Sequence, residues 1–285
     1  MAVLWALFAT AMFTLAAAMS KVAVVDYHVL QILFFRQIIV LLSCLPSLVQ
    51  SFPDSLMTRR PAVHASRLLG AFVALSCGIW AVSVLPLTTA TTLGFVQVFF
   101  VALVASLVLK EIVGLHRISA IMVGFLGVVV VMQPGSTGFI NSYALIPIAG
   151  AMGAAVAIIS VRKLSQTEST ATLLLYQALF IGAMAGVPLL WFWTTPPLND
   201  TLFLLGTGMV AAAANWAGVK ALRLGEASLV ANVQYMQLVY AAVFGWVLFN
   251  EVPDKYTLMG AVLIIGSSIY LLHREAISKR TTNVN

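Results

Sequence analysis

The 285-residue chain is 61% hydrophobic and only 8% charged, with a net charge of +6 and a mean hydropathy of +1.03. Soluble domains carry about 25% charged residues, so this composition excludes a water-soluble globular protein and indicates lipid as the solvent. The basic residues stand between apolar stretches and form no run interleaved with aromatic residues. The positive charge therefore does not indicate a nucleic-acid partner.

Ten apolar runs, each long enough to cross a bilayer, follow one another along the chain. A bilayer core about 30 Å thick needs roughly 20 residues of helix, and β-barrel strands would alternate in polarity, whereas these runs are continuous. The first run has no basic residue before Trp5, which favours a spanning helix over a signal peptide. The sequence predicts an all-α polytopic membrane protein with helices over residues 2–20, 28–50, 66–85, 89–109, 116–133, 142–161, 171–192, 201–220, 227–249 and 256–272.

The distribution of Lys and Arg predicts the orientation of these helices. Of the 15 basic residues, twelve fall in the loops and tail on the side of the two termini. Lys21 and Lys255 fall on the opposite side, and Arg36 falls within the second helix. Because cytoplasmic loops carry the excess of Lys and Arg, we expect both termini in the cytoplasm, which requires an even number of helices.

The chain also repeats itself. A shift of 140 residues aligns residues 9–111 with residues 149–251 without a gap and superimposes polar residues, which match by chance less often than Ala or Leu. Gln37 falls on Gln177, Gln97 on Gln237, and Glu111 on Glu251. We therefore expect two five-helix halves, residues 1–140 and residues 141–285, the second ending in a short basic tail. Because five is odd, the halves enter the membrane in opposite senses, as in many transporters.

Uncharged polar and aromatic side chains within the helices are the candidate substrate-binding residues. Amides and hydroxyls can bond both an ammonium and a carboxylate, and aromatic faces add apolar area and attract cations. The competing interpretation of each amide is hydrogen bonding between helices, and Arg36 either faces a cavity or reaches the membrane surface. The candidates are Trp80, Thr91, Gln97, Asn215, Trp216, Asn232, Tyr235, Gln237 and Arg36.

Motifs for enzyme chemistry are missing from the sequence. It contains no His-Glu-x-x-His, no Gly-x-Ser-x-Gly and no Walker-type phosphate loop. The four histidines are not spaced as metal ligands, and every acidic residue falls in a loop or at a helix end. For Glu111 and Glu251 this position favours helix capping over substrate contact. We expect no enzyme, no metal and no cofactor.

The segment from Ala221 to Leu271 resembles the EamA repeat of the drug/metabolite transporter superfamily. The resemblance rests on Ala221-Leu222 closing the eighth helix, Glu251 ending the ninth, and a following helix with Gly260 and Gly266. The first half carries a weaker version, with Leu109-Lys110-Glu111 and Gly124 to Gly127, and departs from it at Pro86-Leu87. The resemblance, closest to the aromatic amino-acid exporter branch, implies ten helices with helices 1, 3, 4, 6, 8 and 9 around a cavity.

Together these features predict a secondary transporter that exports amino acids or related small metabolites across the plasma membrane by alternating access. We expect a monomer whose partners are its small-molecule substrate and membrane lipid. The alternative within the superfamily is an exporter of cationic drugs or other metabolites. A channel would need a continuous polar stripe or a charged ring, which the sequence does not show, and a membrane-embedded enzyme is disfavoured by the missing motifs.

Overall fold

A computed structural model of the chain describes residues 1–51, 60–109, 115–132, 142–164, 168, 170–224 and 233–282. Within these ranges the protein is helical and contains no strand, which confirms the all-α fold. Four of the described helices are long and apolar enough to cross a membrane by themselves, and six shorter helices are also apolar. The number of ten spans and the cytoplasmic location of the termini stay predictions.

The first half contains six of the described helices. They are α1 (Ala2–Ala23), α2 (Val29–Ser51), α3 (Pro61–Val84), α4 (Leu87–Gly94), α5 (Gln97–Leu109) and α6 (Leu115–Met132). Helix α3 begins before the predicted residue 66, because Pro61 supplies a first-turn residue that needs no backbone N–H donor.

The second half repeats this order. Its elements are the short 3-10 helix η2 (Ser142–Ala144) and the α-helices α7 (Leu145–Leu164), α8 (Thr170–Gly186), α9 (Leu189–Phe192), α10 (Leu198–Leu224), α12 (Met236–Phe249) and α13 (Lys255–Thr282). Pro188 stands between α8 and α9, where the prediction had one helix. Helix α13 runs past the predicted end at residue 272. The basic tail is not apolar, but it forms the last turns of the same helix.

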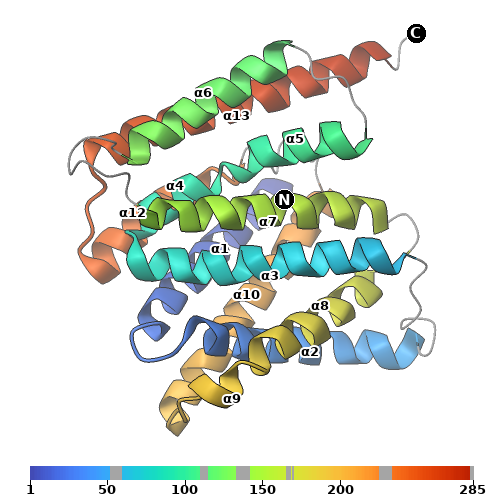
Figure 1. Ribbon diagram of the computed structural model, residues 1–285, viewed down its shortest axis with the longest axis vertical. Helices are drawn as coiled ribbons and strands as arrows, with labels where there is room; N and C mark the ends of the chain where they lie inside the picture. The colour runs from blue at the N-terminus through green and yellow to red at the C-terminus, as the bar shows by residue number, and fades with distance from the viewer. Residues whose placement is uncertain are drawn as a thin grey trace.

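Helices of the two halves pack against each other throughout the bundle (Figure 1). Helix α3 of the first half packs on α7 of the second. The repeat-equivalent contact is made by α10 of the second half on α1 of the first. The pairs α2 with α8 and α6 with α13 each join a helix to its own repeat equivalent. The α6–α13 pair lies at one end of the long axis in Figure 1, and α2 and α8 lie at the other. This reciprocity is what a two-fold relation between the halves produces.

Glycines allow two of these helix pairs to pack so closely that backbone atoms of the two helices are in contact. A Cβ atom added at Gly70 of α3 would lie 2.7 Å from the carbonyl oxygen of Gly153 on α7. One added at Gly260 of α13 would lie 2.6 Å from the carbonyl oxygen of Gly127 on α6. Small residues permit such close helix packing in membranes, so the glycines at these contacts allow α3 to pack on α7 and α6 to pack on α13.

The two helices predicted over residues 89–109 and 227–249 are not continuous, which corrects the sequence analysis. Residues 95 and 96 form a turn between α4 and α5, and residues 234 and 235 form a turn before α12. The two turns overlap under the shift of 140 residues, which places Phe95 on Tyr235. Residues 227–232 of the predicted ninth helix lie outside the described residues.

Candidate substrate cavity

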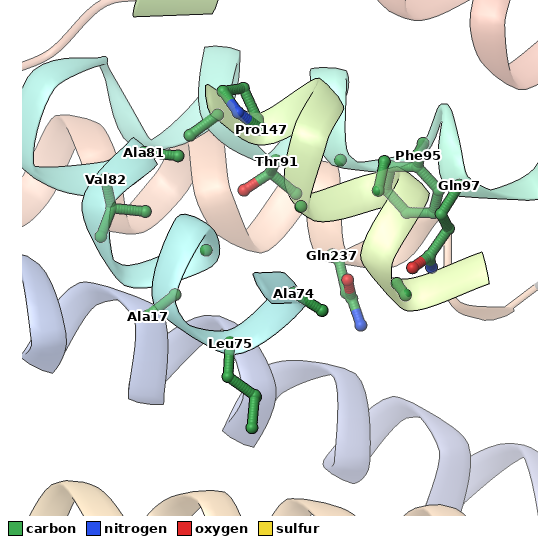
Figure 2. Close-up of a pocket in the computed structure, with 16 residues that line it drawn as sticks. Ala17, Ala74, Leu75, Ala81, Val82, Thr91, Phe95, Gln97, Pro147 and Gln237 are labelled. Carbon is green, nitrogen blue, oxygen red and sulfur yellow. The ribbon is translucent and has the colours of Figure 1, made fainter. Parts of the chain in front are cut away.

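A cavity of about 300 Å³ lies where the interrupted helices of the two halves meet. Its walls come from α1, α3, α4, α5, α7 and α12 (Figure 2). These correspond to the first, third, fourth, sixth and ninth helices, whereas α10, the eighth, contributes no described lining residue. Most of the wall is made of small side chains, among them Ala17, Ala74, Gly78, Gly150 and Ala154, which leave the space open.

Gln97 and Gln237 both line this cavity, one from each half. Gln97 is the first residue of α5 and Gln237 the second of α12, so each follows a helix interruption directly. Neither side-chain amide bonds any other residue within the described ranges. Each therefore offers two N–H donors and a carbonyl acceptor to whatever enters the cavity. Figure 2 shows both side chains at the cavity.

Thr91 is the third predicted site residue in the cavity wall. Its hydroxyl donates a hydrogen bond of 2.7 Å to the carbonyl of Leu87 one turn earlier, so toward a ligand it can only accept. Thr92 makes the same bond to Thr88 at 2.8 Å. Such back-bonding bends helices, and here it comes directly before the interruption at residues 95 and 96.

The two interruptions use the same backbone hydrogen bonds. The N–H of Val98 donates to the carbonyl of Phe95 at 3.1 Å, and the N–H of Leu238 donates to that of Tyr235 at 3.1 Å. Each bond spans three residues, so both turns are tighter than a turn of α-helix. The rings of Phe95 and Tyr235 meet at 5.3 Å between centroids. Phe95 lines the cavity, and Tyr235 packs behind it against the apolar core.

Arg36 lines a neighbouring cavity of about 160 Å³ between α1, α2 and α3. Ala17, Ala74, Leu75, Gly78 and Val82 form part of the walls of both cavities, so the two adjoin. Arg36 therefore lies beside interior space. The structure thus brings Thr91, Gln97 and Gln237 to one cavity and Arg36 to a second cavity that shares a wall with it.

The remaining predicted residues do not line either cavity. Trp80 is 49% exposed, because two helical residues rotate the side chain by about 200° away from Gly78 and Val82. Ser76 and Ser83 share the Trp80 face and bond carbonyls of their own helix. Asn215 is exposed and donates to the carbonyl of Ala211 at 2.9 Å. Asn232 lies outside the described residues.

Trp216 belongs to a separate aromatic cluster where α10 passes the start of α1. It is 59% exposed, and its ring meets that of Trp5 edge-on at 5.2 Å. The Lys220 ammonium lies 4.1 Å from the centroid of Trp5 and 4.8 Å from that of Trp216. Tryptophan is enriched at the membrane–water interface, and the exposed Trp216 ring lies outside the wall of the cavity.

Lys21 and Glu251 form a polar contact, named here the Lys21–Glu251 closure, at the end of the bundle where α1 ends, which the charge distribution predicts to be the outer end. The Lys21 ammonium forms an ion pair with Glu251 and donates to the carbonyl of Leu85 at 2.9 Å. The other carboxylate oxygen of Glu251 accepts from the N–H of Leu87 at 2.9 Å. Glu251 therefore accepts from the first turn of α4, a helix of the other half, and not from the helix that it ends. A hollow of about 630 Å³, lined in part by Lys21 and Phe249, adjoins this closure.

A second charged cluster joins the halves at the opposite end. His64 of α3 forms an ion pair with Glu168, and their side chains are 3% and 2% exposed. Arg67, one turn further, donates to the carbonyl of Leu173 at 2.9 Å and to the side-chain oxygen of Gln177 at 3.0 Å. The sequence places Glu168 in a loop, and only the fold shows that its carboxylate is buried.

A helical bundle of two interlocked halves around a mostly apolar cavity that contains two glutamine side chains is the arrangement expected of a small-molecule transporter. The sequence model of the EamA-like transporter family matches residues 1–133 and 141–272, and the chain belongs to this family. It is thus a multi-pass membrane transporter of the drug/metabolite transporter superfamily, and not an enzyme.

Curated relatives extend over most of the chain. An S-adenosylmethionine uptake transporter of Rickettsia prowazekii is 31% identical over 90% of this chain and 87% of its own length. The pseudopaline exporter CntI of Pseudomonas aeruginosa is 29% identical over 94% and 95%. A riboflavin transporter of Vibrio cholerae is 28% identical over 93% and 87%. These names do not confirm the aromatic amino-acid branch.

A solved structure titled "Crystal structure of protein" shares the fold. It superimposes with a TM-score of 0.61, covers 96% of this chain and 98% of its own, and is 20% identical in sequence. At this identity the match supports the helical architecture alone.

Proposed function

We propose that this protein exports amino acids or amino-acid-derived metabolites across the plasma membrane as a monomer, by alternating access. The observation that carries the proposal is that Gln97 and Gln237, equivalent residues of the two halves, line one cavity with unbonded amides. Substrate sites of repeat-built transporters lie near the bilayer midplane, where interrupted helices of the two halves meet. The interruptions beside both glutamines fit this description.

Alternating access requires that the halves move against each other while the cavity stays between them. We propose the units to be residues 1–140 and 141–285. The Lys21–Glu251 closure and the His64–Glu168 pair each join one unit to the other, and they do so at opposite ends of the bundle. Breaking one set of contacts while keeping the other would open the cavity to one side at a time.

The chemistry of the cavity favours zwitterions over simple organic cations. Among the described residues that line the two adjoining cavities, none is acidic and Arg36 is the one that is charged. A fixed site for a cation in the membrane would contain a buried carboxylate. The S-adenosylmethionine transporters among the relatives support an amino-acid-derived substrate, because that molecule carries both an ammonium and a carboxylate.

Counterflow in proteoliposomes tests the proposal. Liposomes loaded with one unlabelled compound are supplied with a trace of the labelled compound, for a panel of neutral amino acids, S-adenosylmethionine, riboflavin, an organic cation and an organic phosphate. We expect exchange of zwitterions with low affinity and no exchange of the phosphate. Gln97→Ala and Gln237→Ala should each slow exchange by ~10-fold, the cost of about one hydrogen bond. Exchange restricted to the phosphate or to the cation would overturn the proposal.

The matched control is Asn215→Ala. Asn215 is an amide on a neighbouring helix that is exposed and bonded to its own helix. Its removal should leave the exchange rate unchanged. Loss of exchange in this variant, with Gln97→Ala active, would place the substrate outside the cavity described above.

A proton gradient provides a separate test of the coupling. No described acidic residue lines the cavities, so we propose exchange or facilitated movement and not proton-driven accumulation. Uptake is compared with and without an imposed gradient. Strong gradient-driven accumulation that disappears in Glu168→Gln would contradict this and identify the buried His64–Glu168 pair as a proton site.

A further inference from the structure

Arg36 carries a permanent charge deep within a helix. It stands in the third turn of α2 and lines the smaller of the two adjoining cavities, together with Phe13, Ser20 and Ile79. Helix α10 packs directly behind it, because a Cβ atom added at Gly208 would lie 3.2 Å from the Arg36 Cα. The side chain therefore cannot turn toward α10, and the open space before it is the cavity.

Nothing in the described protein neutralises this charge. Arg36 makes no hydrogen bond and no ion pair with another described residue. Of the described residues that form the walls of the two cavities, it is the one with a charged side chain. The nearby Ser20 hydroxyl donates to the carbonyl of Ala16 at 2.8 Å. Because ionised residues inside the membrane are costly and normally face a partner or a cavity, an uncompensated guanidinium indicates an anionic partner that enters from outside.

We infer that Arg36 binds the carboxylate of the transported molecule and so determines that substrates must carry one. This inference rests on the proposed function. The planar guanidinium presents paired N–H donors that match the two oxygens of a carboxylate. The substrate would then span both cavities, with its carboxylate at Arg36 and its uncharged polar groups at Gln97 and Gln237.

The geometry also sets an expectation for size. The larger cavity alone holds about 300 Å³ and the smaller one about 160 Å³, which together fall within the range of about 300–1,000 Å³ typical of pockets for drug-sized ligands. An elongated amino-acid derivative uses both ends of this space. A small amino acid can reach Arg36 or the glutamines, and it is bound more weakly for that reason.

The test compares two molecules that differ only in the carboxylate. Thermal unfolding of the purified protein in detergent is followed with increasing S-adenosylmethionine, decarboxylated S-adenosylmethionine or inorganic phosphate, for the wild type, Arg36→Gln and Arg36→Lys. We expect S-adenosylmethionine to stabilise the wild type at ~10-fold to 100-fold lower concentration than the decarboxylated compound, the effect of one charge-assisted contact. Arg36→Gln should remove this difference, and Arg36→Lys should keep part of it.

The ligand-free proteins give an independent readout. Because the charge has no partner in the described protein, Arg36→Gln should unfold at the same or a higher temperature than the wild type. A lower unfolding temperature would show that Arg36 is a structural residue and would overturn the inference. Equal responses to the two S-adenosyl compounds, including no response to either, would overturn it as well, and so would equal stabilisation by phosphate. Failure of the proposed function would be detected by a different experiment, the counterflow assay, as an absence of exchange for every zwitterion.

Discussion

Phe95 and Tyr235 occupy equivalent positions in the two halves and touch each other, with 5.3 Å between ring centroids. Each stands in the turn that interrupts the fourth helix of its half. Residues that are equivalent in a two-fold arrangement can meet only near its axis, so this contact locates the axis beside the cavity. Aromatic pairs of this kind contribute about 0.5–1.5 kcal/mol beyond the area they bury. The contact therefore stabilises the packing of the two turns against each other.

The first prediction concerns the closure at the predicted outer end. Glu251→Gln keeps an oxygen that can accept from Leu87 but removes the ion pair with Lys21. We expect this variant and Lys21→Gln to open that end more often, by ~10-fold, because breaking a partly buried pair costs one or more kcal/mol. The measurement is the rate at which a membrane-impermeant thiol reagent, added from outside, labels a cysteine placed at Gln97.

Lys220→Gln provides the control for that experiment, since Lys220 contacts Trp5 and Trp216 and not the closure. Its labelling rate should match that of the unaltered background. Unchanged rates in both closure variants would mean that Lys21 and Glu251 merely cap helices and do not gate the cavity.

The second prediction concerns the contact between α6 and α13. In Gly260→Ala the new methyl group would lie 2.6 Å from the carbonyl oxygen of Gly127, a backbone atom that cannot rotate away. Overpacking of this kind costs about 1–3 kcal/mol, which exceeds the gain of about 1 kcal/mol in helix propensity. We expect a lower temperature of unfolding in detergent for this variant.

Gly266→Ala in the same helix is the matched control, because a Cβ atom there meets nothing within 4 Å. This change should leave the unfolding temperature unaltered or raise it. If both variants unfold alike, the close approach of α6 and α13 is not what requires glycine at residue 260.

The third prediction concerns Tyr27, which lies between α1 and α2. Its hydroxyl donates to the carboxylate of Asp200 at the start of α10, and this bond, with burial and the negative charge, raises the pKa of Tyr27 to about 12. A raised pKa means that the contribution to stability is complete below about pH 10 and is lost as the pH rises through about 12. We expect the wild type to lose more stability than Tyr27→Phe between about pH 9 and about pH 11.

Thermal unfolding of the two proteins across this pH range measures the difference, and the titration of other lysines and tyrosines cancels in the comparison. Parallel curves for the two proteins would show that the Tyr27–Asp200 bond does not form in solution.

The fourth prediction is that both termini face the cytoplasm, as the twelve basic residues on their side indicate. A reporter active only in the cytoplasm, fused after Asn285, should be active, and one that requires the periplasm should be silent. The reverse pattern would invert the whole arrangement and place the Lys21–Glu251 closure inside the cell.

Much of the fold follows from the sequence, because the solvent is lipid. Continuous apolar runs predict the helices. The shift of 140 residues predicts from the sequence alone that Gln97 and Gln237 are equivalent residues of the two halves. The interruptions beside them were not predicted, since the runs through residues 89–109 and 227–249 stay apolar. In the first half the interruption follows hydroxyl-to-backbone bonds such as that of Thr91 to Leu87, and such bonds leave no mark on hydropathy.

The site was predicted only in part for a related reason. Helical spacing shows that Ser76, Trp80 and Ser83 share a face, but not whether that face meets lipid or the cavity. In a membrane the outer surface and the core are both apolar, so hydropathy does not separate them. Lys21 and Glu251 are 230 residues apart, and a contact over that distance arises from the packing of whole helices.

The most direct measurement for the central claim is substrate protection of the two glutamines. Gln97→Cys and Gln237→Cys are made separately in a background without Cys44 and Cys77 and treated with a small aqueous thiol reagent. Because both positions line the same cavity, each should be labelled in the absence of substrate, and each should be protected by a zwitterion that the protein exchanges. Resistance to labelling at both positions under every transport condition, or labelling that substrate leaves unchanged, would contradict a shared substrate cavity.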